Sequence, residues 1–513
     1  MKMQRVFLVL CCLAVLGSCS RQKPEAASGG NQPLEFSMYY VDNATLPFRN
    51  DWLTVRTAQE LFNVKINWEI IPVADYPTKV SVALNSGNAP DVILHQSITG
   101  ENASLAANGT IVPISDYASW TPNFNARVAE FGIQADVDLL KLKDGKRYSL
   151  PSLYDKPFYD GGLILREDLL TRYNVPAPRT YDDLYTLAKA YKAENPASYP
   201  VTMLVGPRVH YRMTQPAWGI SVHMNGAGGS RLLSWDYAKN EYFAGVVSSQ
   251  YREYMRFWHK MYAEGLLDPE TVEPIPGDVW TRKMATGASI ATYAYYDQIG
   301  GVAAASTIPG FKLNMYPPLA GPAGAHHQQK NKTGDGILFP AKTARSPNFE
   351  RIVRVVDEMF FSTRGAELWC LGVEGTTFTR QGNNIKFIDS VVNSPDGIYK
   401  AMQLQFGAGS DTTQLVWVNA REMIKYDENY AAINARVAAM DNAIQLIPPT
   451  PKFDDLTAEK ATSLMGPLYD TFIVWDDAFL TGKKSLDTDW AAYVAEMRQK
   501  GLDEYLALYN SNR

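Results

Sequence analysis

The sequence is poor in the residues that build disulfide and metal scaffolds. It has four cysteines and six histidines among 513 residues, so neither a disulfide framework nor a histidine-rich metal site is predicted. Charge of one sign is also scarce, because 49 Lys and Arg stand against 54 Asp and Glu. Without a basic excess, nucleic-acid binding is not favoured. With 46% hydrophobic and 20% charged residues, the chain is globular rather than disordered.

The common catalytic and phosphate-binding motifs are missing as well. The sequence has no His-Glu-x-x-His, no Gly-x-Ser-x-Gly and no Gly-x-x-x-x-Gly-Lys-Ser/Thr pattern. The acids at 136, 138 and 144 do not have the spacing of a calcium loop. Adjacent His326 and His327 lie in a stretch rich in Gly and Pro with no carboxylate at ligand spacing, so we interpret them as part of a solvated loop. We therefore predict no metal and no cofactor.

The N-terminus has the features of an export signal. Lys2 and Arg5 precede an apolar run over 6–16 that is too short to span a membrane. The run ends in Leu16-Gly17-Ser18-Cys19, which resembles the cleavage site of bacterial lipoproteins. The resemblance implies a signal peptide over 1–18, acylation of Cys19 and a flexible tether over 19–33. An ordinary secretory signal is the alternative. Either way, Cys370 is interpreted as a small buried hydrophobe.

Strands and helices alternate in the first part of the chain. Apolar alternation predicts strands over 34–41 and 64–71, and a short apolar strand over 91–94. Helices are predicted over 52–62 and 76–85, the second ending at Gly87. This order favours an α/β fold with a mostly parallel sheet covered by helices. Thr180 and Asp183 match a capping box for a helix, and the chain beyond 420 is predicted to be mostly helical.

Several segments together resemble the extracellular solute-binding proteins of carbohydrate ABC importers, especially the oligosaccharide-binding lipoproteins and, more distantly, maltose-binding protein. The strongest signature is a strand and helix that end in Ser86-Gly87 and lead into Ala89-Pro90-Asp91. The segments follow the family order over nearly the whole chain, at 62–93, 144–151, 165–183, 367–375 and 479–502.

The resemblance implies a two-lobed, type II periplasmic-binding-protein-like fold, with a hinge and a ligand cleft between the lobes. We expect the first lobe to comprise 34–150 with 335–395, and the second 151–334 with 396–513. The chain is expected to cross between the lobes near 150–158, 333–339 and 393–409. The implied partners are an oligosaccharide, the permease subunits of an ABC importer and the lipid membrane, with the protein acting as a monomer and not as an enzyme.

Candidate ligand residues are sought just after the strands, because open α/β sheets present binding groups at the carboxyl ends of their strands. Aromatic rings can stack on sugars, and polar groups can pair with hydroxyls. Trp52 and Trp68 are predicted to lie in the core. Trp218 is equally compatible with the core and with the cleft. In the maltose-binding type, the equivalent loops carry the ligand residues, and the predicted set is Tyr40, Asp42, Asn43, His95, Gln96, Tyr154, Trp218, Tyr295, Tyr296, Asp297 and Trp417.

Three alternatives remain open from the sequence. A surface enzyme that cleaves polysaccharide would need two acids at a set separation, which sequence does not show. A receptor for another solute, such as a peptide or a sugar phosphate, is the second alternative, and Arg208 and Arg212 near Trp218 keep the phosphate possible. A glycan-binding lipoprotein built of helical repeats is disfavoured by the early strands. The expected location is the bacterial cell envelope, lipid-anchored and extracytoplasmic, with the choice of membrane undecided.

Overall fold

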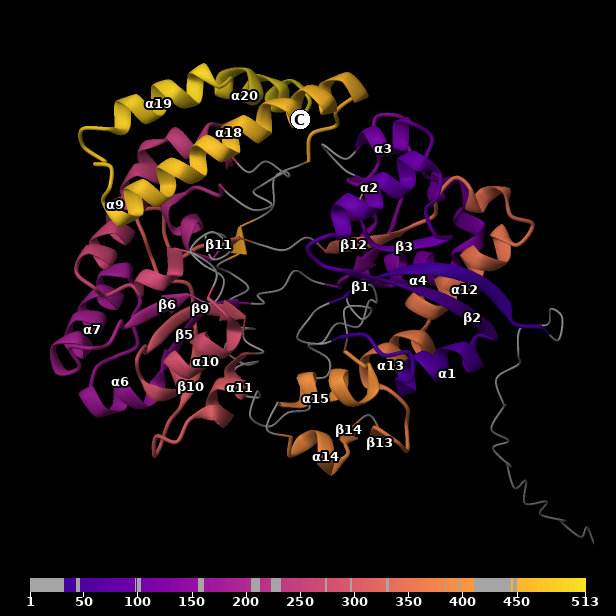
Figure 1. Cartoon of the computed structure of the whole chain (residues 1–513), viewed down its shortest axis with the longest axis horizontal. Coiled ribbons are helices and arrows are strands. Elements are labelled where there is room, and N and C mark those ends of the chain that lie inside the picture. Colours follow the sequence, from indigo (N-terminus) through magenta and orange to yellow (C-terminus); the bar gives the residue numbers. More distant parts are fainter. Residues whose placement is uncertain are drawn as a thin grey trace, which may run out of the picture.

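The computed structural model describes residues 32–42, 47–96, 98, 103–155, 161–203, 213–222, 232–272, 275–295, 298–328, 332–382, 384–394, 397–409, 444–445 and 450–513. These residues form two α/β lobes that lie side by side, each built around its own sheet (Figure 1). Within the described residues, no helix is long and apolar enough to cross a membrane.

The first lobe is built on a five-stranded sheet of order β2-β1-β3-β12-β4. Strands β1 and β2 are parallel, as are β1 and β3, whereas β12 is antiparallel to both β3 and β4. The strands are β1 (Leu34–Asp42), β2 (Val64–Pro72), β3 (Val92–Gln96), β4 (Leu150–Leu153) and β12 (Thr333–Leu338). The predicted α/β fold class is confirmed. The sheet is mixed rather than mostly parallel, because β12 returns between β3 and β4 in the antiparallel sense.

Helices cover the first sheet on both faces and complete its core. Tyr76 opens the helix predicted before β3, and Gly87 ends it in the left-handed conformation as expected. The elements of this lobe are α1 (Leu53–Leu61), α2 (Tyr76–Ser86), α3 (Ala103–Ala107), η2 (Ile114–Trp120), α4 (Pro122–Phe131), α5 (Gln134–Asp138), η7 (Thr343–Arg345), α12 (Phe349–Phe361), α13 (Thr363–Leu371), β13 (Phe378–Gln381), β14 (Asn384–Phe387), α14 (Asp389–Val392) and α15 (Gly397–Phe406).

The second lobe is built on a four-stranded sheet of order β10-β5-β9-β6. Its strands are β5 (Gly161–Arg166), β6 (Val201–Met203), β9 (Ala291–Tyr295) and β10 (Leu313–Tyr316). Strand β5 is antiparallel to both of its neighbours, and β6 is parallel to β9. Strand β5, one of the two inner strands, is buried along its whole length, as its apolar sequence predicts.

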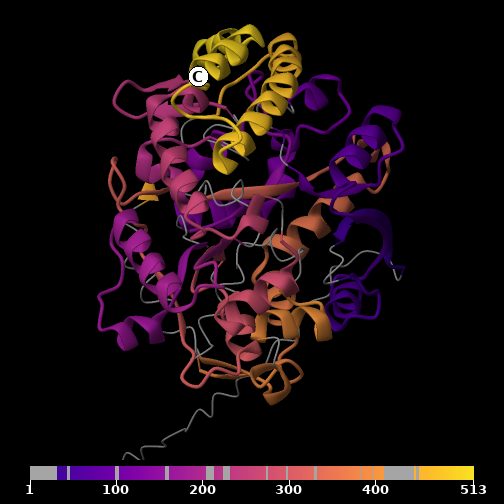
Figure 2. The ribbon, with the colours of Figure 1, turned by 60° about the vertical axis from the view of Figure 1, so that its left-hand side comes forward.

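Three C-terminal helices extend the core of the second lobe. Helix α18 (Asp455–Thr481) packs along α9 (Ser249–Ala263), and α19 (Trp490–Gln499) and α20 (Leu502–Ser511) lie beside it at one end of the molecule (Figure 2). The remaining elements of this lobe are α6 (Glu167–Tyr173), α7 (Tyr181–Glu194), η3 (Gln215–Trp218), β7 (Ser234–Asp236), β8 (Glu241–Phe243), η5 (Gly245–Val247), η6 (Pro269–Val272), α10 (Gly277–Thr286) and α11 (Gln298–Ala305). The capping box predicted at Thr180 and Asp183 opens α7.

The lobe boundaries in the structure differ from the expected ones at three places. Strand β12 belongs to the first sheet from Thr333, two residues before the boundary expected at 335. Strand β4 carries the first sheet to Leu153, three residues past the boundary expected at 150. Helix α15 was assigned to the second lobe, but Ile398 and Met402 are buried in the core of the first. Its carboxyl end is held there because the Trp52 Nε1–H donates to the carbonyl of Leu404 (3.3 Å). The polarity pattern of α15 gives no sign of which core it joins.

The lobes also touch away from their connecting segments. Helix α18 contacts α3 of the first lobe, and the Lys143 Nζ lies 3.1 Å from an Asp454 carboxylate oxygen. Asp454 is the N-cap of α18, and its side chain accepts a hydrogen bond from the Thr457 N–H. The Thr457 hydrogen bonds, followed by Lys143, lower the pKa of Asp454 to about 2. The carboxylate therefore stays charged at neutral pH.

Close packing of β12 predicts the effect of one glycine substitution. An added Cβ at Gly336 would lie 2.9 Å from the Ser149 Cβ and 3.0 Å from the Leu150 carbonyl oxygen. We expect Gly336→Ala to lower the free energy of unfolding by about 1–3 kcal/mol, because the sheet must shift. The matched control is Gly301→Ala in α11, where an added Cβ meets nothing within 4 Å. It is expected to raise the free energy of unfolding by roughly 0.5–1 kcal/mol, and equal effects in urea denaturation would contradict this.

Candidate ligand-binding site

The path of the chain defines an edge that both sheets share. The chain leaves the first lobe after β4 and returns to it at the start of β12. Here Leu153 pairs with Thr333, and the Tyr154 N–H donates to the Lys332 carbonyl (2.8 Å). Because β3 and β4 are antiparallel to β12, and β1 and β2 run parallel to β3, the carboxyl ends of all four lie at this edge.

The same reasoning applies to the second sheet. Strand β5 is its first strand after the chain arrives, so its amino end faces the first lobe. Strands β9 and β10 are antiparallel to β5, and β6 is parallel to β9. The carboxyl ends of β6, β9 and β10 therefore face the first lobe as well. We call these two facing rims the crossing edge, and open α/β sheets bind ligands at such ends.

His95 has an unusual backbone at the crossing edge. Opposite β12, Gln96 pairs with Gly336 and Ile93 with Leu338, so β3 has one residue more than its partner over this span. His95 stands in this bulge with a φ of 54°. The left-handed conformation costs a residue other than glycine of order 1–3 kcal/mol, and such strain gathers at functional sites. A bulge changes the direction in which a side chain leaves its strand. His95, which is half-buried, stands in this bulge at a position where the sequence predicts a ligand group.

Neighbouring tyrosines hold the strand that carries His95. The Tyr76 hydroxyl donates to the carbonyl of Leu94 (2.6 Å), and the Tyr76 ring meets the Tyr39 ring edge-on with centroids 6.3 Å apart. Burial raises the pKa of both hydroxyls, so both stay protonated at neutral pH. Helix α2 and strand β1 thereby fix the residue before the bulge.

An aromatic cluster lies at the end of β1. Tyr40 is buried, and its ring is 4.6 Å from Phe48 and 6.0 Å from Trp68. Asp42 is half-buried, and its carboxylate accepts the N–H of Phe48 (2.8 Å). The prediction of a buried Trp52 is confirmed, whereas Trp68 is only partly buried. Phe48 was not predicted for the site, because it falls in no strand or helix and follows β1 by six residues.

The start of β12 brings polar groups to the same edge. The exposed Asp335 lies near Tyr76, where its charge contributes to the raised pKa of that hydroxyl. The half-buried Tyr154 stands beside Ser152, with their hydroxyl oxygens 3.5 Å apart. Gln96 is half-buried and pairs with Gly336. Asp335 was missed because only the strand pairing places β12 next to β3.

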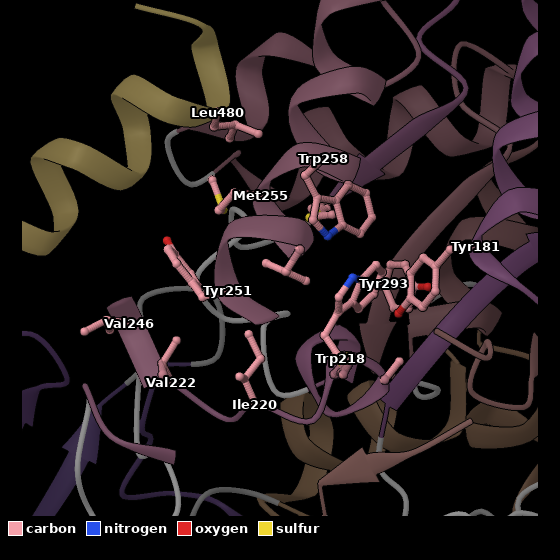
Figure 3. Close-up of a cluster of buried hydrophobic side chains, with 14 of the residues drawn as sticks. Tyr181, Trp218, Ile220, Val222, Val246, Tyr251, Met255, Trp258, Tyr293 and Leu480 are labelled. Atoms are coloured by element: carbon pink, nitrogen blue, oxygen red, sulfur yellow. The ribbon is translucent and has the colours of Figure 1, made fainter. Parts of the chain in front are cut away.

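In the second lobe, Tyr295 and Trp218 occupy different environments. Tyr295 ends β9 opposite Gly161 and is half-buried, so it lies on the crossing edge. Trp218 is 6% exposed and packs against Tyr181, with ring centroids 4.4 Å apart, and against Tyr254 at 5.2 Å. Figure 3 shows Trp218 beside Tyr181 and Tyr293 in the core below α9. In this structure its ring serves packing.

The remaining predicted residues lie outside the described part of the chain. They are Asn43, Tyr296, Asp297 and Trp417, together with Arg208, Arg212 and the acylation site Cys19. They stay predictions. The prediction of a buried Cys370 is confirmed.

His327 corrects the interpretation of the His-His pair as a solvated loop. Its side chain is 1% exposed, and its Nε2 lies 3.0 Å from the carbonyl oxygen of Gly161. The Gly- and Pro-rich composition around it suggested a surface loop. The composition does not reveal that this segment approaches the point where β5 begins.

The described residues at the crossing edge offer aromatic rings, hydroxyls, an imidazole and carboxylates. Such groups bind neutral hydroxyl-bearing ligands by stacking and hydrogen bonds. Among the described residues, no group of three or more His, Cys, Asp or Glu could hold a metal ion.

A separate hollow of about 700 Å³ is lined by Glu167, Leu170, Asn174, Val175 and Tyr316, among others. None of the predicted ligand residues lines this hollow.

Comparison with known proteins identifies the family. The model of the family described as bacterial extracellular solute-binding protein matches residues 54–348, more than half of the chain. The chain therefore belongs to this family, and the resemblance inferred from the sequence is confirmed. Proteins of this family bind solutes.

Curated relatives and solved structures agree with this assignment. The chain is 20% identical over 409 residues to the polygalacturonan/rhamnogalacturonan-binding protein YtcQ of Bacillus subtilis, covering 74% of this chain and 77% of the relative. It is 22% identical over 550 residues to the fructooligosaccharide ABC transporter substrate-binding protein FusA of Streptococcus pneumoniae, covering 98% and 96%. Lipoprotein LipO of Bacillus subtilis is 22% identical over 280 residues, 53% of this chain and 52% of the relative.

Among solved structures, the alginate-binding protein AlgQ2 without calcium ion superimposes with a TM-score of 0.75. It shares 19% sequence identity, and the match covers 94% of this chain and 98% of AlgQ2. This confirms the two-lobed α/β fold.

The strained backbone at His95 gives a prediction about stability. We expect His95→Val to lower the free energy of unfolding by about 1–3 kcal/mol, since a β-branched residue adopts the left-handed conformation poorly. His95→Asn should change it by less than about 0.5 kcal/mol, because asparagine tolerates that conformation. Urea denaturation of both variants checks this. Equal destabilisation would show that the side chain, and not the backbone, is what the fold requires.

Proposed function

We propose that the protein is the solute receptor of a carbohydrate ABC importer and that it captures an oligosaccharide at the crossing edge by closure of its lobes. The observation that carries the proposal is the convergence of strand ends from both sheets on this edge. A ligand held there contacts both lobes at once, and its binding energy favours the arrangement in which they are close together. The protein then presents the loaded form to permease subunits.

The groups at the crossing edge suit a neutral sugar better than catalysis. His95 and Tyr154 supply hydrogen-bonding groups, and Asp42 and Asp335 supply acceptors for hydroxyls. Aromatic rings at the edge, such as Phe48, supply apolar surface for a pyranose or furanose face. We propose that these side chains bind the sugar without breaking it, as the family's binding function supports. The name of FusA points to fructooligosaccharides, which are neutral, as the first ligands to test. The acidic galacturonans in the name of YtcQ serve as the charged comparison.

We further propose that Cys19 anchors the protein to the outer face of a membrane. The lipoprotein-like sequence at 16–19 supports this, as does the similarity to lipoprotein LipO. The first strand begins at Leu34, so a tether of this kind would join the first lobe at the amino end of β1. That end is opposite the crossing edge.

Thermal unfolding with a panel of glycans tests the proposed ligand class. The panel comprises fructooligosaccharides, oligogalacturonides, alginate oligosaccharides, milk oligosaccharides and a tripeptide, with the chain produced from Gln32 onward. A sugar that binds only the folded form should stabilise it by about 2.7 kcal/mol at a hundredfold excess over its Kd. The ligand is then recovered and checked by mass spectrometry, and His95→Asn serves as the variant with an altered site.

The outcomes separate the alternatives. Stabilisation by one glycan class, loss of this effect in His95→Asn and recovery of intact glycan support the proposal. Stabilisation by the peptide alone, or by no sugar, contradicts the ligand class. Recovery of shortened glycan contradicts a receptor and supports an enzyme.

Acylation is tested by labelling. The full chain, expressed in a bacterium fed radioactive palmitate, should incorporate label and sediment with membranes. Cys19→Ser should abolish the label and leave the protein unprocessed, because the thiol that receives the lipid is lost. Cys370→Ser serves as the control and should keep the label, since Cys370 is buried in the fold. Label in Cys19→Ser, or none in the parent, would contradict the anchor.

A further inference from the structure

His327 belongs to β11 (His327–Gln328), a short strand that lies in the second lobe below α18 in Figure 1 and contacts η3. Its side chain is buried, and its Nε2 is 3.0 Å from the carbonyl oxygen of Gly161. Because a carbonyl oxygen only accepts, Nε2 carries the hydrogen. The imidazole therefore joins the segment that returns to the first lobe with the segment that enters the second.

The backbone of His327 joins a third segment. Strand β11 pairs in parallel with β15 (Ile444–Gln445), with His327 opposite Ile444. Strand β15 lies between α15, which packs in the first lobe, and α18, which packs in the second. Among the described residues, His327 thus joins one point on each path between the lobes: Gly161 on the first, its own strand on the second, and β15 on the third.

Gly161 is itself held tightly. An added Cβ there would come within 2.3 Å of the Met213 Cε and 2.8 Å of the Ala294 carbonyl oxygen. Gly161 also pairs with Tyr295, a predicted ligand residue. The hydrogen bond from His327 therefore ends on a fixed point of the second sheet, beside the crossing edge. The lobes have separate cores, so we expect a change in their separation to leave each core intact.

We propose that His327 is a positioning residue that ties the three connections together on the side of the second lobe, so that the lobes move as two rigid bodies about one hinge. The proposal rests on the proposed function only where ligand binding is used to measure it. The tie keeps the Gly161–Tyr295 pair in place for capture. Without it, Gly161, β11 and β15 are no longer held to one another, and we expect the lobes to sample a wider range of separations.

Two substitutions separate the hydrogen bond from the space that the ring fills. His327→Gln keeps an N–H donor near the position of Nε2, whereas His327→Leu fills a similar volume without a donor. The matched control is His259→Leu, because the His259 Nδ1 lies 3.0 Å from the carbonyl oxygen of Leu480 within the second lobe. That variant loses a histidine–carbonyl hydrogen bond without touching a connection between the lobes.

The direct readout is the spread of distances between the lobes, measured by double electron–electron resonance without any ligand. Spin labels are placed through Lys79→Cys on the first lobe and Ala190→Cys on the second, both exposed, while Cys370 is buried. We expect a broader distance distribution in His327→Leu, and the parental width in His327→Gln and His259→Leu. The same width in His327→Leu as in the parent would overturn the proposal, as would broadening in His259→Leu.

The affinity for the ligand supplies the second readout once a glycan is known. Loss of the tie should weaken binding by roughly 3- to 10-fold, as expected for one buried hydrogen bond. Binding should return to the parental value in His327→Gln. Because the distance measurement needs no ligand, a wrong ligand class leaves it intact, whereas an unchanged distance spread refutes the tie even when the glycan binds. Equal weakening in His259→Leu would reduce His327 to a general stabilising role and overturn the proposal.

Discussion

The antiparallel pairing of β4 and β12, at the point where the chain leaves the first lobe and returns to it, largely determines where the functional groups of this protein lie. Leu153 lies opposite Thr333, and the Tyr154 N–H donates to the Lys332 carbonyl. Together with the pairing of β12 to β3, this fixes the directions of the strands in the first sheet. Because β5 is the first strand of the second sheet after the crossing, the carboxyl ends of β1–β4 and of β6, β9 and β10 lie at one edge. The strained His95, the aromatic cluster at the end of β1 and Tyr295 are brought to this edge by strand direction rather than by proximity in the sequence.

The same constraint explains why glycines lie in β12. This strand passes between β3 and β4, and added atoms at Gly334 or Gly336 would meet Ser152 and the backbone around Leu150 at 2.4–3.0 Å. A strand at the middle of a sheet usually carries side chains that strengthen it. Here the small residues permit a close approach of three backbones at the point where the lobes join. The glycines weaken β12 as a strand, but they allow β3, β12 and β4 to pack closely at the crossing edge.

Much of this fold could be predicted from the sequence, because its elements have strong local patterns. Alternating apolar residues indicate β1 and β2, the Ser-Gly stop ends α2, and Thr180 with Asp183 begins α7. The lobe to which α15 belongs could not be predicted, since its apolar residues would fit either core. Likewise, the burial of His327 depends on a distant partner, Gly161, to which no local pattern refers.

The candidate site was predictable to the level of strand ends, but not of side-chain environment. The rule that ligand groups follow parallel strands places His95, Asp42 and Tyr295 on the crossing edge. It says nothing of the bulge that turns His95, which depends on the pairing with β12, 240 residues away by the Gly336–Gln96 register. For Trp218 the rule does not tell packing from binding, and the structure shows its ring in the core. Phe48 and Asp335 were missed because loop length and strand order, not residue type, bring them to the edge.

A crystal structure with the oligosaccharide that stabilises the protein most would test the central claim most directly. The account predicts that the sugar lies at the crossing edge, in contact with the end of β3 at His95 and with the end of β9 at Tyr295, so that both lobes share it. A sugar bound to one lobe alone, for example in the hollow between α6 and Tyr316, would contradict capture between the lobes.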